Sequence, residues 1–237
     1  MKSLEKKLEP ADVTAFHKNV TMFTALVRRN LISQAHVVLE RIIAPLHPDP
    51  PLSQRTTQQA LCMYHISPVV PTVEGCTKIA GKLHGLRVLE INAHRGVWGT
   101  YLQSLGMSLD MIHRAKKQYA TCIGAVMGTE SPPSYVQGAK GRYDALLMVK
   151  PDTQDGMGDA LACAQAFSGD WIVYVGMEPP EAMSDVEKEG HVWTFLEKHY
   201  VFVDWCACPT WPYTNDHIMF YRKKANVPVP LTPSEHK

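Results

Sequence analysis

The chain has 237 residues, and its 24 lysines and arginines nearly balance 23 aspartates and glutamates, giving a formal net charge of +1. This charge indicates no bulk attraction to nucleic acid, so contact with nucleic acid is expected only within a larger complex. No apolar run approaches the ~18 residues that a membrane helix requires. The charged N-terminus lacks the apolar core of a secretory signal, and its acidic residues disfavour an organellar transit peptide. We therefore expect an intracellular protein with no membrane contact. The cytoplasm is the default compartment, and an organelle is left open.

Residues 11–45 carry two helical patterns. Apolar residues recur at alternating three- and four-residue intervals from Val13 to Val27, and a second apolar pattern runs from Ile32 to Ile43. The proline-rich stretch 47–51 then interrupts helical structure. We therefore predict that residues 1–50 form a helical extension that covers an edge of the next domain. The alternative is an arm that binds protein partners.

Residues 51–224 alternate between helical and strand patterns, which predicts an α/β fold with a doubly wound, mostly parallel sheet. The last two strands are expected to pair antiparallel, and residues 225–237 are expected to form a proline-spaced tail that is either extended or mobile. No element is assigned to residues 114–142, where Ser131-Pro132-Pro133 and Gly138–Gly141 are loop signals. The predicted helices are 53–65, 72–83, the segment from Trp98 to Leu105, 157–167 and 191–199; the predicted strands are 86–91, 108–113, 143–149, 171–175, 200–208 and 217–222.

Six cysteines are scattered through mostly apolar surroundings, and without a secretory signal we expect reduced thiols. In Cys206-Ala207-Cys208, a strand places both thiols on one face, with His191, His199 and His217 nearby in sequence. No second cysteine pair or ordered histidine spacing completes a zinc pattern. We therefore predict core cysteines and no metal site.

The stretch from Leu86 to Leu102 reads as a short apolar strand, a tight polar turn and a helix. This is the first unit of a doubly wound sheet, and ligands of such sheets bind at the carboxyl ends of the strands. Its Glu90-Ile91-Asn92-Ala93-His94-Arg95-Gly96 segment resembles the first motif of class I S-adenosylmethionine-dependent methyltransferases, Glu/Asp-x-Gly-x-Gly-x-Gly. More narrowly, the chain resembles a little-characterised methyltransferase-like group over about residues 64–223. Further matching pieces are Val70-Pro71-Thr72, Asp144 to Pro151 and Gly169 to Met177.

The resemblance implies a Rossmann-like, seven-stranded methyltransferase sheet and a cofactor site formed by Glu90, Asn92, His94, Gly96 and His113. Asn92 and His94 replace the first two glycines of the motif, and His113 stands where the family carries the aspartate that grips the ribose. Asn tolerates the left-handed backbone, so we expect Asn92 to keep the bend. An imidazole at His94 is expected to project toward the cofactor's space; the alternative is a turn relaxed outward, with His94 in solvent.

The methyl acceptor is expected near Lys150-Pro151-Asp152-Thr153, which aligns with the family's Trp-Pro-Pro-Tyr and lacks both aromatic residues. Asp152 is the candidate catalytic residue, as a proton or hydrogen-bond acceptor. The substitutions fall on the ligand-facing edge, whereas scaffold positions are kept. Our first hypothesis is thus a catalytically inactive methyltransferase-like protein, without cofactor, that acts as a structural, binding or assembly component of a larger complex. The second is an active methyltransferase with a divergent S-adenosylmethionine site, and a binder of another nucleotide ranks last.

Overall fold

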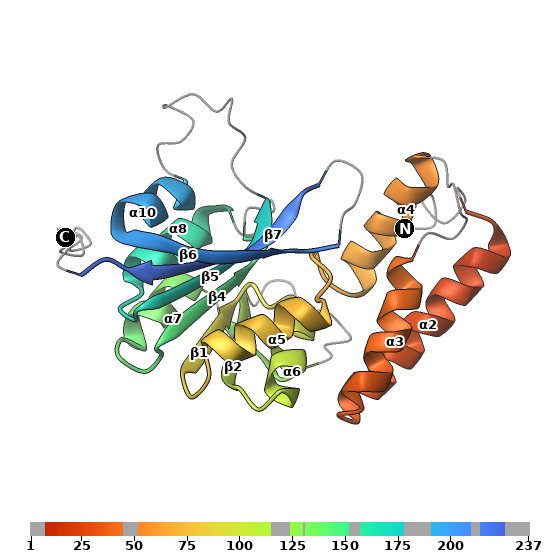
Figure 1. Ribbon diagram of the computed structural model, residues 1–237, viewed down its shortest axis with the longest axis horizontal. Coiled ribbons are helices and arrows are strands. Elements are labelled where there is room, and N and C mark those ends of the chain that lie inside the picture. The colour runs from red at the N-terminus through yellow and green to blue at the C-terminus, as the bar shows by residue number, and fades with distance from the viewer. Residues whose placement is uncertain are drawn as a thin grey trace.

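The computed structural model describes residues 8–44, 52–114, 124–129, 131–151, 157–177, 191–209 and 214–225, and Figure 1 shows their arrangement. Helices and strands alternate along the chain after an all-helical beginning. The helices are α2 (Pro10–Arg28), α3 (Ile32–Ile43), α4 (Leu52–His65), α5 (Val73–Lys82), α6 (Val97–Ser104), α7 (Pro132–Gly138), α8 (Met157–Ala166) and α10 (Val192–His199). The strands are β1 (Arg87–Ile91), β2 (Ser108–Arg114), β3 (Val126–Thr129), β4 (Ala145–Val149), β5 (Trp171–Met177), β6 (Tyr200–Ala207) and β7 (Asp216–Lys223).

The strands form one seven-stranded sheet in the order β3-β2-β1-β4-β5-β7-β6. All neighbouring pairs from β3 to β5 are parallel, whereas β7 is antiparallel to both β5 and β6. The chain first winds outward from β1 to β3 and then crosses to β4 on the other side, so the sheet has a switch point between β1 and β4. The predicted doubly wound, mostly parallel sheet with an antiparallel terminal pair is confirmed.

Both faces of the sheet are covered, as the nearly continuous apolar runs of its central strands require. Helices α5 and α6 cover one face, where Cys76, Trp98 and Phe220 belong to one buried cluster. Helices α7, α8 and α10 cover the opposite face, with Cys163 and Leu196 in a second cluster. The alternation of side chains along each strand divides the core into these two layers.

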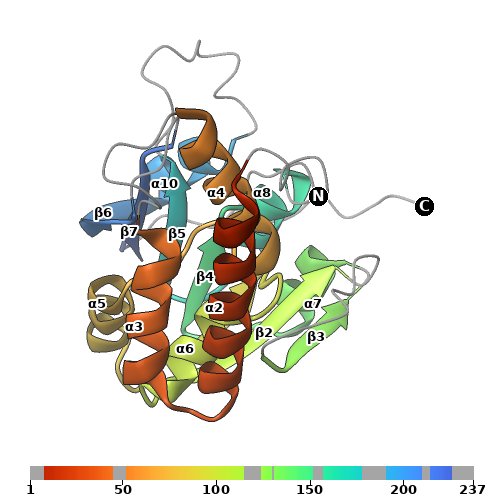
Figure 2. The same cartoon turned by 90° about the vertical axis from the view of Figure 1, so that its right-hand side faces the viewer.

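The N-terminal helices α2 and α3 lie side by side at one end of the molecule (Figures 1 and 2). Their buried stripes pack with α4 in a third apolar cluster, which also includes Val70 and Val97 of the α/β part. The two predicted helices are present, and they pack on α4 and on the beginning of α6. The third cluster comprises Leu8, Phe16, Val20, Phe23, Val27, Ala35, Val38, Leu39, Ile42, Leu61, Cys62, Ile66, Val70 and Val97.

The segment 114–142, left without elements by the sequence, contains strand β3 and helix α7. The loop interpretation of Ser131-Pro132-Pro133 is wrong, because Ser131 caps α7 and the prolines occupy its first positions. Proline suits that position, since the first helical N–H has no partner within the helix. The predicted tail lies outside the described residues beyond Ala225. In the described part of the chain, no helix has the length and apolarity to cross a bilayer.

Candidate functional site

The turn after β1 keeps a glycine-like backbone although two of its residues are not glycine. Asn92 and His94 have φ angles of 54° and 47°, and Gly96, which precedes α6, has a φ of 75°. The left-handed conformation expected of Asn92 is therefore present, and His94 shares it. A β-carbon on Gly96 would lie 2.8 Å from the Val126 side chain, so glycine is required there by space as well as by backbone. The backbone of this turn therefore has the left-handed conformation typical of glycine, although two of its residues carry side chains.

Glu90 lies beneath this turn, between β1 and α6, and is fully buried. The backbone N–H of Gly99, in the first turn of α6, donates a hydrogen bond to its carboxyl group, which partly lowers the pKa, but burial dominates and raises it from 4.5 to about 8. The other oxygen, Oε2, has no hydrogen-bond partner among the described residues. Glu90 therefore acts as a largely protonated cap for α6, since Gly96 has no side chain to provide one.

His94 and His113 come together at the carboxyl ends of β1 and β2. Their ring centroids are 5.3 Å apart, and the two residues are only 9% and 7% exposed. The alternative in which His94 points to solvent is wrong, because the Ala93 N–H donates to the Ile112 carbonyl at 3.0 Å and holds the turn against the tip of β2. Two imidazoles therefore occupy the strand tips on the β2 side of the switch point.

Arg95 connects the turn to the N-terminal helices. Its guanidinium donates to the backbone carbonyl of His65, the last residue of α4, while its own carbonyl accepts from the Gly124 N–H at 3.3 Å. No pattern in the sequence indicates this role, since a single arginine in a polar turn is ordinarily solvated. The turn is thus tied to α4 on one side and to the segment before β3 on the other.

On the other side of the switch point, the tip of β4 carries a mostly buried ion pair. Lys150, whose φ is 45°, places its Nζ 2.5 Å from Oδ1 of Asp216, the first residue of β7. From the sequence alone, Lys150 is placed only in the segment expected near the methyl acceptor, because its partner Asp216 is 66 positions away. Asp152, the candidate catalytic residue, lies outside the described residues.

The end of β2 carries a second ion pair, in which the Arg114 Nε donates to Asp159 Oδ2 of α8 at 3.0 Å. This pair, like that of Lys150, joins residues far apart in sequence. The charged groups of these two pairs are therefore engaged with one another across the fold, rather than pointing together into open space.

Cys206, in β6, and Cys208, just after the strand, lie on the same face, as predicted, and belong to the same buried cluster as Cys76. Burial raises the pKa of all three thiols. Within the described ranges, no group of three or more histidine, cysteine or acidic side chains has an arrangement that would hold a metal ion. These cysteines pack as small apolar residues.

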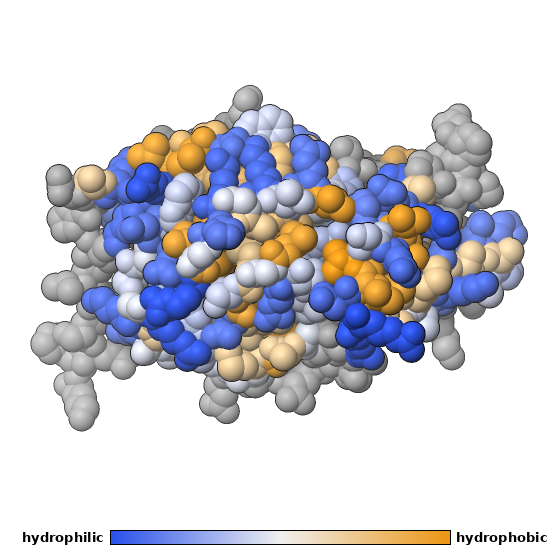
Figure 3. Space-filling view, turned by 60° about the horizontal axis from the view of Figure 1, so that its bottom comes forward, coloured by the Kyte–Doolittle hydropathy of each residue, from blue (hydrophilic) through white to orange (hydrophobic). Residues whose placement is uncertain are grey.

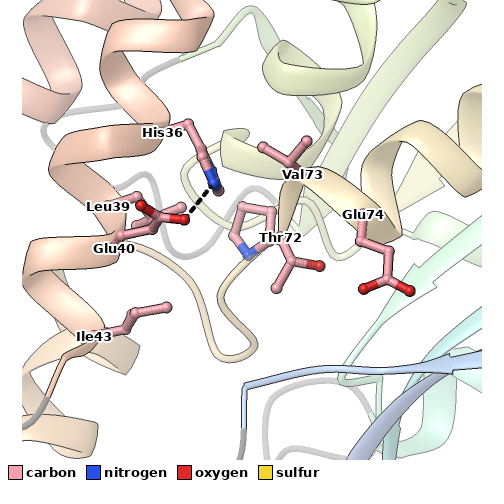
Figure 4. A pocket seen from close by; sticks show the side chains of 8 residues that line it. His36, Leu39, Glu40, Ile43, Thr72, Val73 and Glu74 are labelled. Carbon is pink, nitrogen blue, oxygen red and sulfur yellow. Dashed lines mark hydrogen bonds and ion pairs between the residues drawn. The ribbon is translucent and has the colours of Figure 1, made fainter.

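A cavity of about 380 Å³ lies away from the strand tips, between α3 and the beginning of α5 (Figure 4). Leu39, Ile43 and Val73 contribute apolar surface, and the His36 ring contacts Glu40 at 2.9 Å. Its mixed lining includes no residue of the candidate cofactor turn. It is a feature of the junction between the N-terminal helices and the α/β part.

The order of the strands, the reversed β7 and the left-handed turn between β1 and α6 together decide the architecture. The chain has the class I methyltransferase fold. No family model and no curated protein matches the sequence.

Among solved structures, this methyltransferase fold is similar to several enzymes. Magnesium protoporphyrin IX methyltransferase from Synechocystis PCC 6803, with bound SAM, shares 12% identity over 85% of this chain and 97% of that one, with a TM-score of 0.45. The 1,6-didemethyltoxoflavin-N1-methyltransferase of Burkholderia thailandensis shares 18% over 77% and 93%, with a TM-score of 0.44. The tRNA (uracil-54, C5)-methyltransferase of Pyrococcus abyssi shares 16% over 63% and 37%, with a TM-score of 0.45. At such identities and scores, no substrate or activity is transferred to this chain.

Proposed function

We propose that this chain is a methyltransferase-like protein without methyl-transfer activity, which serves as a structural or binding component of a larger assembly. The observation that carries the proposal is the buried His94–His113 pair at the tips of β1 and β2. In the resembling enzymes, glycine leaves this space open and an aspartate accepts hydrogen bonds from the ribose. An imidazole in the first position fills space, and one in the second lacks the negative, two-oxygen acceptor.

These residues do not fit S-adenosylmethionine. Glu90, the retained acid, faces Gly99 inside the protein rather than the strand tips, and burial keeps it largely protonated at neutral pH. Arg95 is engaged with the carbonyl of His65. The turn that would cradle a cofactor is therefore used for internal packing.

The assembly role rests on the outer surface of α2 and α3. Met22, Leu31 and Val37 are large apolar residues exposed on these helices and their connection. Figure 3 shows apolar side chains grouped on the right-hand part of the face that it presents, where these helices lie. Exposed apolar patches of this kind are typical of protein-binding surfaces.

Cofactor binding is tested by thermal denaturation of the purified chain with S-adenosylmethionine or S-adenosylhomocysteine, supported by calorimetry. A ligand at a hundred times its Kd adds about 2.7 kcal/mol, or roughly 5–11 °C for a chain of this size. We expect no shift for the wild type. The matched variant Asn92→Gly/His94→Gly/His113→Asp restores the family's residues and is expected to gain a shift. Stabilisation of the wild type by either compound would refute the loss of the cofactor site.

The assembly role is tested by affinity purification of the full chain from its own cells. Deleting residues 1–50 is unsuitable, because it would expose Leu61 and Ile66 of the third apolar cluster. Instead, Val37→Asp places a charge on the exposed face of α3, and Gln34→Asp adds the same charge at an exposed polar position of that helix. Partners lost with Val37→Asp and kept with Gln34→Asp support the proposal. Failure of the wild type to retain any partner contradicts it.

A further inference from the structure

The cavity between α3 and the beginning of α5 has no part in the cofactor turn or in the strand tips. Its volume of about 380 Å³ falls within the range of about 300–1,000 Å³ that is typical of ligand pockets. Two glutamates line it, Glu40 from α3 and Glu74 from α5. Half of the lining residues are apolar, and they form an apolar wall: Leu39, Ile43, Pro71 and Val73.

This cavity opens to the surface of the protein. Val73 is 39% exposed, and the Glu40 side chain is 61% exposed. Figure 4 shows Glu40 extending from α3 toward Thr72, with Glu74 on the side of α5. A free small molecule is ordinarily held in a site that buries most of its surface. An open cavity of this size is better filled by a side chain whose own protein covers the mouth, as in the pockets of protein interfaces.

The charge at the cavity is negative. The Glu40 carboxylate contacts the ring of His36 at 2.9 Å, and this ring carries a balancing charge only when it is protonated. Glu74 forms no ion pair with any residue in the described ranges, and no lysine or arginine of these ranges lines the cavity. Lys78 lies one turn after Glu74 in α5, but its Nζ is paired with Asp204 Oδ1 at 2.9 Å. The two carboxylates therefore lack a permanent counter-charge.

An anion does not suit this site, although the N-terminus of a helix attracts negative charge. The Gly75 N–H already donates to the Thr72 hydroxyl oxygen at 3.0 Å, and Glu74 supplies a negative charge in the first turn of α5. A bound anion would also be repelled by both carboxylates. A cation with an apolar stem instead meets opposite charge and the apolar wall together.

We propose that this cavity binds an arginine side chain of a protein partner, with the aliphatic stem against the apolar wall and the guanidinium beside Glu40 and Glu74. Arginine suits the site because its guanidinium is weakly hydrated and pairs with carboxylates through two hydrogen bonds. Arginine is also enriched among the residues that contribute most to binding at interfaces. The protein source of this arginine rests on the proposed assembly role, whereas the cation site itself does not.

NMR titration of the full chain with propylguanidinium, which reproduces the end of an arginine side chain, tests the cavity directly. We expect saturable shifts of the backbone amides of Glu40, Val73 and Glu74. Propylurea lacks the charge and guanidinium lacks the apolar stem, so each is expected to bind at least roughly fivefold more weakly at constant ionic strength.

A pair of variants tests the role of the two carboxylates. Glu40→Gln/Glu74→Gln is expected to weaken the binding of propylguanidinium at least roughly fivefold, because both changes remove charge at exposed positions. Glu197→Gln is the matched control: it removes an exposed carboxyl group on α10 and is expected to bind as the wild type does. Circular dichroism checks that both variants keep the fold.

Four results of these titrations would overturn the proposal. Without saturable shifts at the three amides, the cavity binds no such cation. Equal binding of propylurea would leave an apolar cavity that does not recognise charge, and equal binding of guanidinium would leave surface charge alone. Unchanged binding by the double variant would exclude the two carboxylates as the recognition groups.

Affinity purification of the full chain then separates this proposal from the assembly role. Partners that are lost with the double variant, kept with Glu197→Gln, and released from the wild type by propylguanidinium but not by propylurea support a protein arginine. If the double variant loses propylguanidinium but keeps every partner, the cavity serves a free cation and the protein source is overturned. If the wild type retains no partner while it binds propylguanidinium, the assembly role fails and the protein source with it.

Discussion

The buried carboxyl group of Glu90 gives the protein a predictable pH dependence. The folded state raises its pKa from 4.5 to about 8, chiefly through burial, so the folded protein holds a proton that the unfolded chain releases. Between pH 4.5 and about pH 8 the folded state binds more protons than the unfolded state, and the free energy of unfolding therefore falls as pH rises. The contribution of Glu90 to the free energy of unfolding is fully present below its pKa in the unfolded chain, and it is lost as pH rises through its pKa in the folded protein.

The size of this effect follows from the two pKa values. One pKa unit corresponds to about 1.4 kcal/mol, so the difference between 4.5 and about 8 amounts to about 5 kcal/mol over the whole titration. About 3 kcal/mol of this falls between roughly pH 5.5 and pH 8.5. For a chain of this length, that loss lowers the Tm by roughly 6–12 °C.

The variant Glu90→Gln isolates the contribution. A glutamine can still accept the hydrogen bond from the Gly99 N–H but does not titrate, so its stability is expected to lack this decline. Urea denaturation of both proteins at several pH values measures the difference between the two curves, from which all other titrating groups cancel. The control Glu197→Gln changes an exposed carboxyl group and is expected to follow the wild type. Parallel curves for the wild type and Glu90→Gln would refute the burial argument.

Further substitutions test packing and charge elsewhere. Gly99→Ala places a β-carbon 2.4 Å from the sulfur of Met111 and is expected to lower the free energy of unfolding, measured by thermal denaturation, by about 1–3 kcal/mol. Gly81→Ala adds a β-carbon at an exposed helix position with no atom within 4 Å, so it is expected to raise the free energy of unfolding by about 0.5–1 kcal/mol. Equal effects of the two substitutions would contradict this reasoning. Lys150→Met leaves its buried aspartate partner without a counter-charge and is expected to cost about 3–5 kcal/mol in urea denaturation. Arg142→Met breaks an exposed pair and is expected to cost less than about 1 kcal/mol; the reverse order would contradict the burial assignment.

Local patterns predicted most of the fold. The apolar stripe from Val13 to Val27 and the buried runs of the central strands have periods of 3.6 and 2, which depend only on neighbouring residues. Helix α7 was missed because Ser131-Pro132-Pro133 begins a helix as readily as it forms a loop, and seven residues leave little periodicity to decide. Strand β3 was missed because Val126–Thr129 has four residues, none of them fully buried.

At the candidate site, the sequence predicted the left-handed Asn92 from its side chain and the presence of His94 and His113 at neighbouring strand tips. Their contact depends on the register between β1 and β2, which the sequence does not encode locally. The link from Arg95 to His65 and the pair between Lys150 and Asp216 join segments that meet only in the folded chain. Long-range polar contacts of this kind require the three-dimensional arrangement.

The hydrogen bond from Arg95 to the last residue of α4 connects the N-terminal helices to the loop between β1 and α6. Helices α2, α3 and α4 share one apolar core, and Val97, the first residue of α6, belongs to that core as well. A substitution that loosens this core is therefore expected to weaken the support of the loop between β1 and α6 as well as that of the helices.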